Sequence, residues 1–131
     1  MGKISVLIIE AHSAFLRSLT ELLAGQPDIQ VVGETRSAAN APDSMQTFAP
    51  DVVVLDISLT GNSGLAVGRQ LKVLSPTTKI VILTGDDQTV YRRAVHDAGA
   101  DALVKKAFIV TELIPCIRKV FQEESLDGIE Q

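Results

Sequence analysis

The chain has 131 residues, of which 46% are hydrophobic, a formal net charge of −4 and a single cysteine, Cys116. This length and apolar content suffice for one core, whereas a lone thiol excludes an internal disulfide and a two-thiolate metal site. The scattered lysines and arginines argue against a nucleic-acid or anionic-membrane surface, and the lack of a long apolar run predicts a cytoplasmic protein without a membrane span.

Short apolar runs rich in β-branched residues predict five strands. They are expected at residues 4–9, 29–32, 52–55, 80–83 and 102–104. Every gap between them is long enough for a helix. Strict alternation of buried strands and helices predicts an α/β fold, a doubly wound parallel sheet with helices on both faces.

Apolar residues at helical spacing predict a helix after each strand. The first is expected to begin at Ser13 as N-cap and to stop at Gly25, and the last to begin at Thr111 as N-cap. The other three are expected over 42–48, from 63–64 to Pro76, and from 86–87 to Gly99. The acidic residues 123–131 lose the periodic pattern. We therefore expect one domain over residues 1–122 and a tail, or the start of a linker, over 123–131.

Polar side chains stand where the strands end: Glu10 after the first, Asp56 after the third, Thr84 after the fourth and Lys106 after the fifth. Open parallel sheets bind ligands beyond the carboxyl ends of their strands. Asp56 is favoured as a site residue because it follows four core residues and precedes a glycine-containing turn. Glu10 reads almost equally well as a surface acid. His12 reads as a first-turn helix residue rather than a catalyst.

Four stretches, VLIIEAHSAFLRSL, DVVVLDISLTGNSG, VILTGDD and AGADALVKKAF, together resemble the receiver domain of two-component response regulators. Their order and spacing cover the chain from residue 4 to about 121. The first stretch is most similar to receivers that precede a helix-turn-helix DNA-binding domain of the NarL/LuxR type. The resemblance implies a flavodoxin-like fold with strand order 2-1-3-4-5, and a role in phosphorelay signalling and transcription regulation.

The resemblance also implies the roles of three residues. Asp56 would accept a phosphoryl group from a sensor histidine kinase, while Lys106 and Thr84 contact the phosphoryl oxygens. Any catalysis would be limited to self-phosphorylation and self-dephosphorylation, so an enzyme is not expected. The resemblance leaves a homodimer open, and it places any contact with DNA in an output domain outside these 131 residues.

The expected metal site departs from the pattern of the family. Receivers usually end the first strand in two acids, and Ala11 stands here where the acid that ligates Mg²⁺ directly would be. The resemblance leaves Glu10, Asp56 and the carbonyl group of Ser58 as ligands. Because carboxylates are the main protein ligands of Mg²⁺, we expect weakened binding.

Two further departures concern switching. Leu103 replaces an aromatic residue that, in the family, moves inward with the hydroxyl at the position of Thr84, and Thr60 replaces a common proline. With Ala11, they motivate an alternative, a degenerate pseudo-receiver that binds proteins independently of phosphate. A haloacid-dehalogenase-type phosphatase is disfavoured because Ser58 stands where its second aspartate would be.

Overall fold

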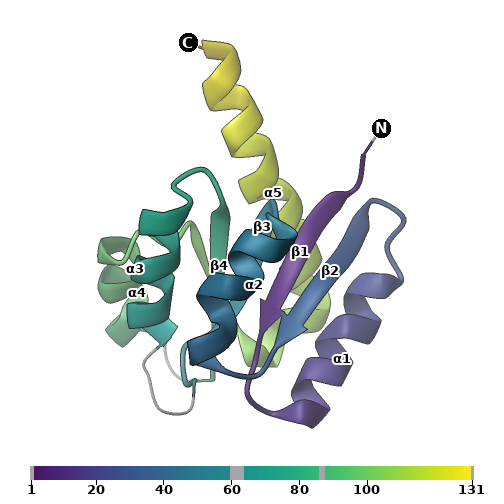
Figure 1. The fold of residues 1–131 in the computed structure, drawn as a ribbon, viewed down its shortest axis with the longest axis vertical. Coiled ribbons are helices and arrows are strands. Elements are labelled where there is room, and N and C mark those ends of the chain that lie inside the picture. Colours follow the sequence, from purple (N-terminus) through teal and green to yellow (C-terminus); the bar gives the residue numbers. More distant parts are fainter. Residues whose placement is uncertain (1, 60–63, 86–87, 131) are drawn as a thin grey trace.

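The computed structural model describes residues 2–59, 64–85 and 88–130, in which strands and helices alternate (Figure 1). The strands are β1 (Ile4–Ile9), β2 (Ile29–Thr35), β3 (Val52–Asp56), β4 (Lys79–Thr84) and β5 (Ala102–Lys105). The α-helices are α1 (Ser13–Ala24), α2 (Ala41–Phe48), α3 (Gly64–Leu74), α4 (Gln88–Asp97) and α5 (Ile109–Glu130). Short 3₁₀ turns, Ala38–Asn40 and Lys106–Phe108, precede α2 and α5.

The strands form one parallel sheet in the order β2-β1-β3-β4-β5, which confirms the predicted fold class and strand order. Every residue of β3, in the middle of the sheet, is buried. Asp56 lies opposite Leu83, and Thr84 lies opposite Lys105. The carboxyl ends of these three neighbouring strands therefore meet at one edge of the sheet.

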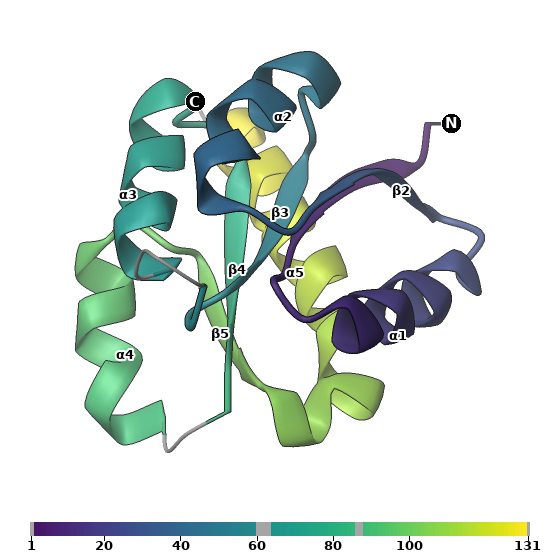
Figure 2. The same ribbon diagram turned by 60° about the horizontal axis from the view of Figure 1, so that its bottom comes forward.

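Helices cover both faces of the sheet, as Figure 2 shows. Buried leucines of α1 pack with Leu113 and Ile117 of α5 against one face. Met45 of α2, Leu71 of α3 and Val95 of α4 pack against the other. The central strands β3 and β4 thus bury apolar side chains on both faces, which is why their sequences are nearly continuous apolar runs.

The structure corrects both predicted N-caps. His12, with an extended backbone, is the N-cap of α1, and Ser13 is already helical. Thr111 lies inside α5, where its hydroxyl group donates a hydrogen bond of 3.4 Å to the carbonyl oxygen of Phe108. In both places a polar residue that can cap a helix lies inside its first turn: Ser13 is the first residue of α1, and Thr111 is the third residue of α5.

Helix α5 continues to Glu130, through the acidic residues in which a tail or linker was expected (Figure 1). Glutamate and glutamine favour helix, so the loss of apolar periodicity marks the end of packing against the sheet rather than the end of the helix. The start predicted at 63–64 agrees with Gly64 as the first residue of α3, whereas the start predicted at 86–87 lies outside the described residues. Within the described ranges, no helix is both long and apolar enough to cross a membrane.

Candidate functional site

Asp56 is the last residue of β3 and is almost fully buried, with 1% of its surface exposed. Its Oδ1 atom accepts a hydrogen bond of 3.1 Å from the backbone N–H of Ser58, whereas Oδ2 has no hydrogen-bond partner. A buried carboxylate oxygen without a donor is costly unless a cation lies close by. This oxygen is therefore the first sign of a site.

The turn after Asp56 is held close by α3. The N–H of Gly64 donates a hydrogen bond of 2.9 Å to the carbonyl oxygen of Ile57. A Cβ atom at Gly64 would lie under 3.0 Å from backbone atoms of Asp56 and Ile57. Only glycine lets the helix approach the end of β3 so closely.

Glu10 follows β1, the strand beside β3, and is fully buried. Its Oε2 atom accepts a hydrogen bond of 3.0 Å from the backbone N–H of His12, and its Oε1 atom has no hydrogen-bond partner. Burial raises the pKa of the Glu10 carboxyl group, and the charge of Asp56 raises it further. The hydrogen bond from the His12 N–H and the charge of Lys106 lower this pKa, but they do not cancel the increase. Glu10 is thus a buried acid next to Asp56, not an acid exposed at the surface.

Lys106 supplies the positive charge. Its Nζ atom lies 3.3 Å from Oδ2 of Asp56 and 3.7 Å from Oε1 of Glu10. The same ammonium group lies 4.7 Å from the centre of the Phe15 ring, within the range of a cation–π contact. The neighbouring Lys105 instead lies over the Phe108 ring. One ammonium group therefore serves both carboxyl groups.

The other predicted residues, Thr84, Ser58 and Leu103, differ in burial and in their position on the strands. Thr84 is fully buried at the end of β4, next to the end of β3, whereas Ser58 is exposed on the turn that follows Asp56. Leu103 lies inside β5, two residues before the end of the strand. It is half-buried on β5, against the face of the sheet that α4 covers. The structure thus brings Glu10 and Asp56 together with Lys106.

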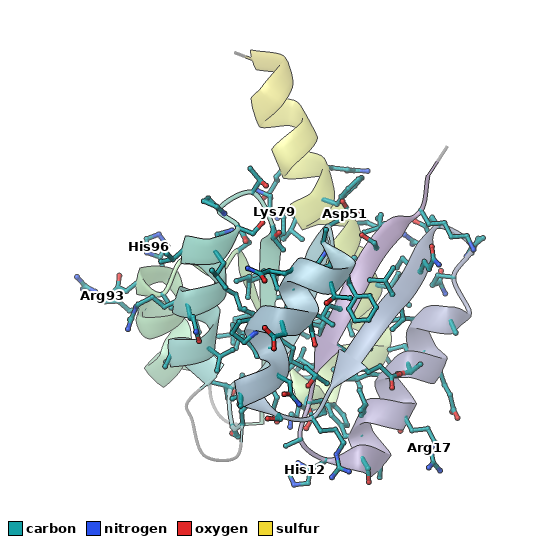
Figure 3. The ribbon with its side chains drawn as sticks, in the orientation of Figure 1. His12, Arg17, Asp51, Lys79, Arg93 and His96 are labelled. Carbon is teal, nitrogen blue, oxygen red and sulfur yellow. The ribbon has the colours of Figure 1, made fainter. Side chains whose placement is uncertain are left out.

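His12 and Phe15 are the neighbours of the site that the sequence did not assign to it. His12 Nδ1 lies 3.5 Å from Glu10 Oε2, and one ligand atom each from Glu10, His12 and Asp56 lie within 4.8 Å of one another. Figure 3 shows His12 at the edge of the sheet where the strands end. The signal available in the sequence was the position of His12 two residues, and of Phe15 five residues, after Glu10, the acid that follows β1.

The ligand atoms present fit a cation, although Ala11 leaves one carboxylate fewer than two acids at the end of the first strand would give. Oε1 of Glu10 and Oδ2 of Asp56 are buried oxygens without hydrogen-bond partners. Ala11 offers no side-chain donor, and its carbonyl oxygen accepts a hydrogen bond of 2.9 Å from Nε of Arg36. Two carboxylates and an imidazole thus remain as side-chain ligands among the described residues.

A doubly wound sheet with buried acids and a lysine at its carboxyl edge is the architecture of a phosphate- or metal-binding α/β protein. The model of the response regulator receiver domain family matches residues 6–118 of the chain. The chain belongs to this family: it is a response regulator receiver domain of two-component systems.

Several response regulators are similar to this chain in sequence. The response regulator VraR of Staphylococcus saprophyticus is 30% identical over 125 residues, which cover 94% of this chain and 59% of the relative. GacA of Pseudomonas aeruginosa is 29% identical, covering 90% of the chain and 55% of GacA. The chain therefore spans less than two thirds of either relative.

Solved structures agree on the fold. A LuxR-family DNA-binding response regulator from Staphylococcus aureus is 25% identical, with a TM-score of 0.82 over 90% of this chain and 98% of that one. A LuxR-family regulator from Aurantimonas sp. SI85-9A1 superposes with a TM-score of 0.88 at 23% identity, over 93% of this chain and 87% of that one.

Proposed function

We propose that this receiver domain accepts a phosphoryl group on Asp56 from a sensor histidine kinase. The observation that carries the proposal is Oδ2 of Asp56, buried without a hydrogen-bond partner and 3.3 Å from Nζ of Lys106. An oxygen that keeps its lone pairs free beside a fixed positive charge suits an attack on an electrophilic phosphorus atom.

The chemistry is a transfer between two nucleophiles. A carboxylate oxygen of Asp56 forms a bond to phosphorus while the P–N bond of a phosphohistidine breaks, and the imidazole leaves with the electron pair. The Lys106 ammonium group stabilises charge on a phosphoryl oxygen, and the Thr84 hydroxyl group donates to another. The Ser58 N–H, which already binds Oδ1, orients the carboxylate. We propose no turnover of a separate substrate, so any catalysis is limited to the domain's own phosphorylation and dephosphorylation.

A divalent cation supports this transfer. Receiver domains generally bind Mg²⁺, and the buried oxygens of Glu10 and Asp56, with the carbonyl group of Ser58, would hold it here. When bound, the ion supplies positive charge that offsets the charge of the phosphoryl oxygens.

The output would pass through β5. Thr84 pairs with Lys105, and Leu103 lies two residues earlier on β5, lining surface depressions shared with α4 and α5. We infer that a shift of Thr84 toward the phosphoryl group changes the face formed by α4, β5 and α5. Contact with DNA would require an output domain beyond these residues, and that same face could form a homodimer.

The alternative function, a pseudo-receiver, is supported by two residues of the sequence. Ala11 and Leu103 remove a metal ligand and an aromatic switch residue, which favours a pseudo-receiver that binds proteins without phosphate. Thr60, the third departure behind this alternative, lies outside the described residues. The two functions differ in whether Asp56 can be phosphorylated at all.

Intact-mass spectrometry separates them. The wild-type chain, incubated with acetyl phosphate and Mg²⁺, is expected to gain the mass of one phosphoryl group, and Asp56→Asn to gain none. Asp51→Asn is the matched control, because Asp51 lies at the opposite end of the same strand, and it should be labelled like the wild type. An unlabelled wild type, or equal labelling of Asp56→Asn, would contradict the proposal.

A further inference from the structure

We propose that His12 is the third side-chain ligand of the metal site, in place of the carboxylate missing at Ala11, so that the site prefers Zn²⁺ to Mg²⁺. The inference deepens the proposed function, since it rests on the metal site beside Asp56. It reverses our interpretation of His12 from the sequence, as a helix residue without a role.

The backbone places the imidazole beside the acids. His12 is the N-cap of α1, with φ −84° and ψ 116°, so it lies outside the helical turn. Its N–H donates to Oε2 of Glu10, which holds the two residues together. The short link between β1 and α1 therefore brings a nitrogen ligand to the open side of two buried carboxylates.

The spacing of the ligand atoms suits a small coordination sphere. His12 Nδ1 and Glu10 Oε2 are 3.5 Å apart. One ligand atom each from His12, Glu10 and Asp56 lie within 4.8 Å of one another. A tetrahedral Zn²⁺ with bonds of about 2.0–2.1 Å separates adjacent ligands by about 3.4 Å. An octahedral Mg²⁺ with bonds of about 2.1 Å separates adjacent oxygens by only about 3.0 Å. The observed pair is closer to the tetrahedral spacing.

Two buried atoms point independently to a cation. Oε1 of Glu10 and Oδ2 of Asp56 lack hydrogen-bond partners, and the side chains that carry them are 1% and 0% exposed. The only positive charge that contacts both, among the described residues, is the ammonium group of Lys106. The His12 side chain is 75% exposed, so this side of the site stays open to water or to a phosphoryl oxygen.

Ligand chemistry gives the preference for the ion. Mg²⁺ selects oxygen ligands, so exchanging a carboxylate for an imidazole weakens its binding. Zn²⁺ binds nitrogen and oxygen ligands in the same site. A site with both kinds of ligand therefore binds Zn²⁺ more tightly than a hard ion such as Mg²⁺. Coordination through Nδ1 leaves the proton on Nε2, where water can accept it.

The test is isothermal titration calorimetry of the full chain with Zn²⁺ and with Mg²⁺, without any phosphoryl donor. The wild type is expected to bind Zn²⁺ at least about 100-fold more tightly than Mg²⁺. His12→Ala should weaken Zn²⁺ binding by at least about tenfold and change Mg²⁺ binding by less than about twofold. Zn²⁺ binding that is the same in His12→Ala as in the wild type, or an equal loss for both ions, overturns the proposal.

His96→Ala is the matched control. His96 also lies beside a carboxylate, with Nδ1 3.7 Å from Oδ1 of Asp97, but both side chains are exposed. Neither belongs to the residues with buried unpaired oxygens in the described part of the chain, which are Glu10 and Asp56. The variant should bind Zn²⁺ like the wild type. Equal losses in His96→Ala and His12→Ala would indicate adventitious surface binding and would overturn the proposal.

A spectroscopic measurement reads the ligand directly. In ¹⁵N spectra of the imidazoles, Zn²⁺ should shift Nδ1 of His12 and leave Nε2 protonated, with His96 unchanged. Ala11→Asp, which restores the second acid, should tighten Mg²⁺ binding by at least about tenfold and reduce the preference for Zn²⁺.

The outcomes of the two proposals are separable. If Asp56 is phosphorylated but Zn²⁺ does not shift the His12 resonance, only the proposed role of His12 is overturned. Zn²⁺ binding that depends on His12, in a chain that acetyl phosphate leaves unlabelled, would overturn only the phosphoryl transfer.

Discussion

Two aspartates at the ends of β3 show how position decides the role of one residue type. Asp51 Oδ2, before the strand, accepts hydrogen bonds from the N–H and the hydroxyl group of Ser5, at 2.9 and 3.0 Å. Asp56 Oδ2, at its carboxyl end, has none. Figure 3 shows Asp51 and His12 at opposite edges of the sheet. The first acid ties strands together, and the second keeps an oxygen available for chemistry.

This contrast predicts opposite effects on stability. Asp51→Ala leaves the Ser5 donors without their partner and should lower the free energy of unfolding by about 1–3 kcal/mol. Asp56→Asn removes a buried charge from beside Glu10 and should raise that free energy by about 1 kcal/mol, as replacement of a site residue often does. Urea denaturation of the three proteins at neutral pH measures both changes. A destabilised Asp56→Asn would mean that the Lys106 contact outweighs the repulsion between the acids.

At the scale of elements, the local pattern of apolar residues predicts which segments form strands and helices, but it does not predict the residues at which they begin and end. The predicted strand at 4–9 coincides with β1. The other strands are longer than predicted by one to three residues. Pairing with neighbouring strands extends them over less apolar residues, such as Gly33 and Glu34 in β2. The N-cap of α1 is His12 rather than the predicted Ser13, since the choice of N-cap depends on the backbone that enters from β1.

Helix α2 ends on a residue that the sequence does not favour there. Ala49 has φ 43° and ψ 58°, the left-handed conformation, and its N–H donates to the carbonyl oxygen of Met45 at 2.9 Å. Glycine usually occupies this position, because a Cβ atom is strained in it.

We therefore expect Ala49→Gly to raise the free energy of unfolding by about 0.5–1 kcal/mol, measured by urea denaturation. Gly99→Ala is the matched control and should lower the free energy of unfolding. Gly99, after α4, has φ 85°, and a Cβ atom there would lie 3.1 Å from Cγ of Lys72. A destabilising Ala49→Gly would show that the entropy of the unfolded chain outweighs the relief of strain.

At the scale of the whole molecule, one ion pair joins the last helix to the start of β2. Arg118 of α5 donates to both carboxylate oxygens of Asp28, each at 2.9 Å, and to Gln26 at 2.8 Å. The guanidinium group lowers the pKa of the Asp28 carboxyl group below its ordinary value. The pair connects segments that are 90 residues apart.

The lowered pKa gives the pH dependence its sign. Because the folded state holds Asp28 ionised more strongly than the unfolded chain, the pair stabilises the fold at neutral pH, and this stabilisation is lost as pH falls through the lowered pKa. Arg118→Ala should lower the urea midpoint at pH 7, and its difference from the wild type should shrink on acidification. Arg17→Ala, at an exposed position of α1, is the control and should show no such dependence. A difference that stays constant with pH would contradict this.

The sequence by itself determined the alternation of strands and helices, and its motifs carried the strand order and the family. It also placed Glu10, Asp56, Thr84 and Lys106 at strand ends, because local apolar periodicity marks where each strand stops. Only the tertiary structure decided that two carboxylate oxygens stay without hydrogen bonds, and that His12 Nδ1 lies 3.5 Å from Glu10. Those facts depend on the directions of side chains from separate elements, which no local pattern encodes.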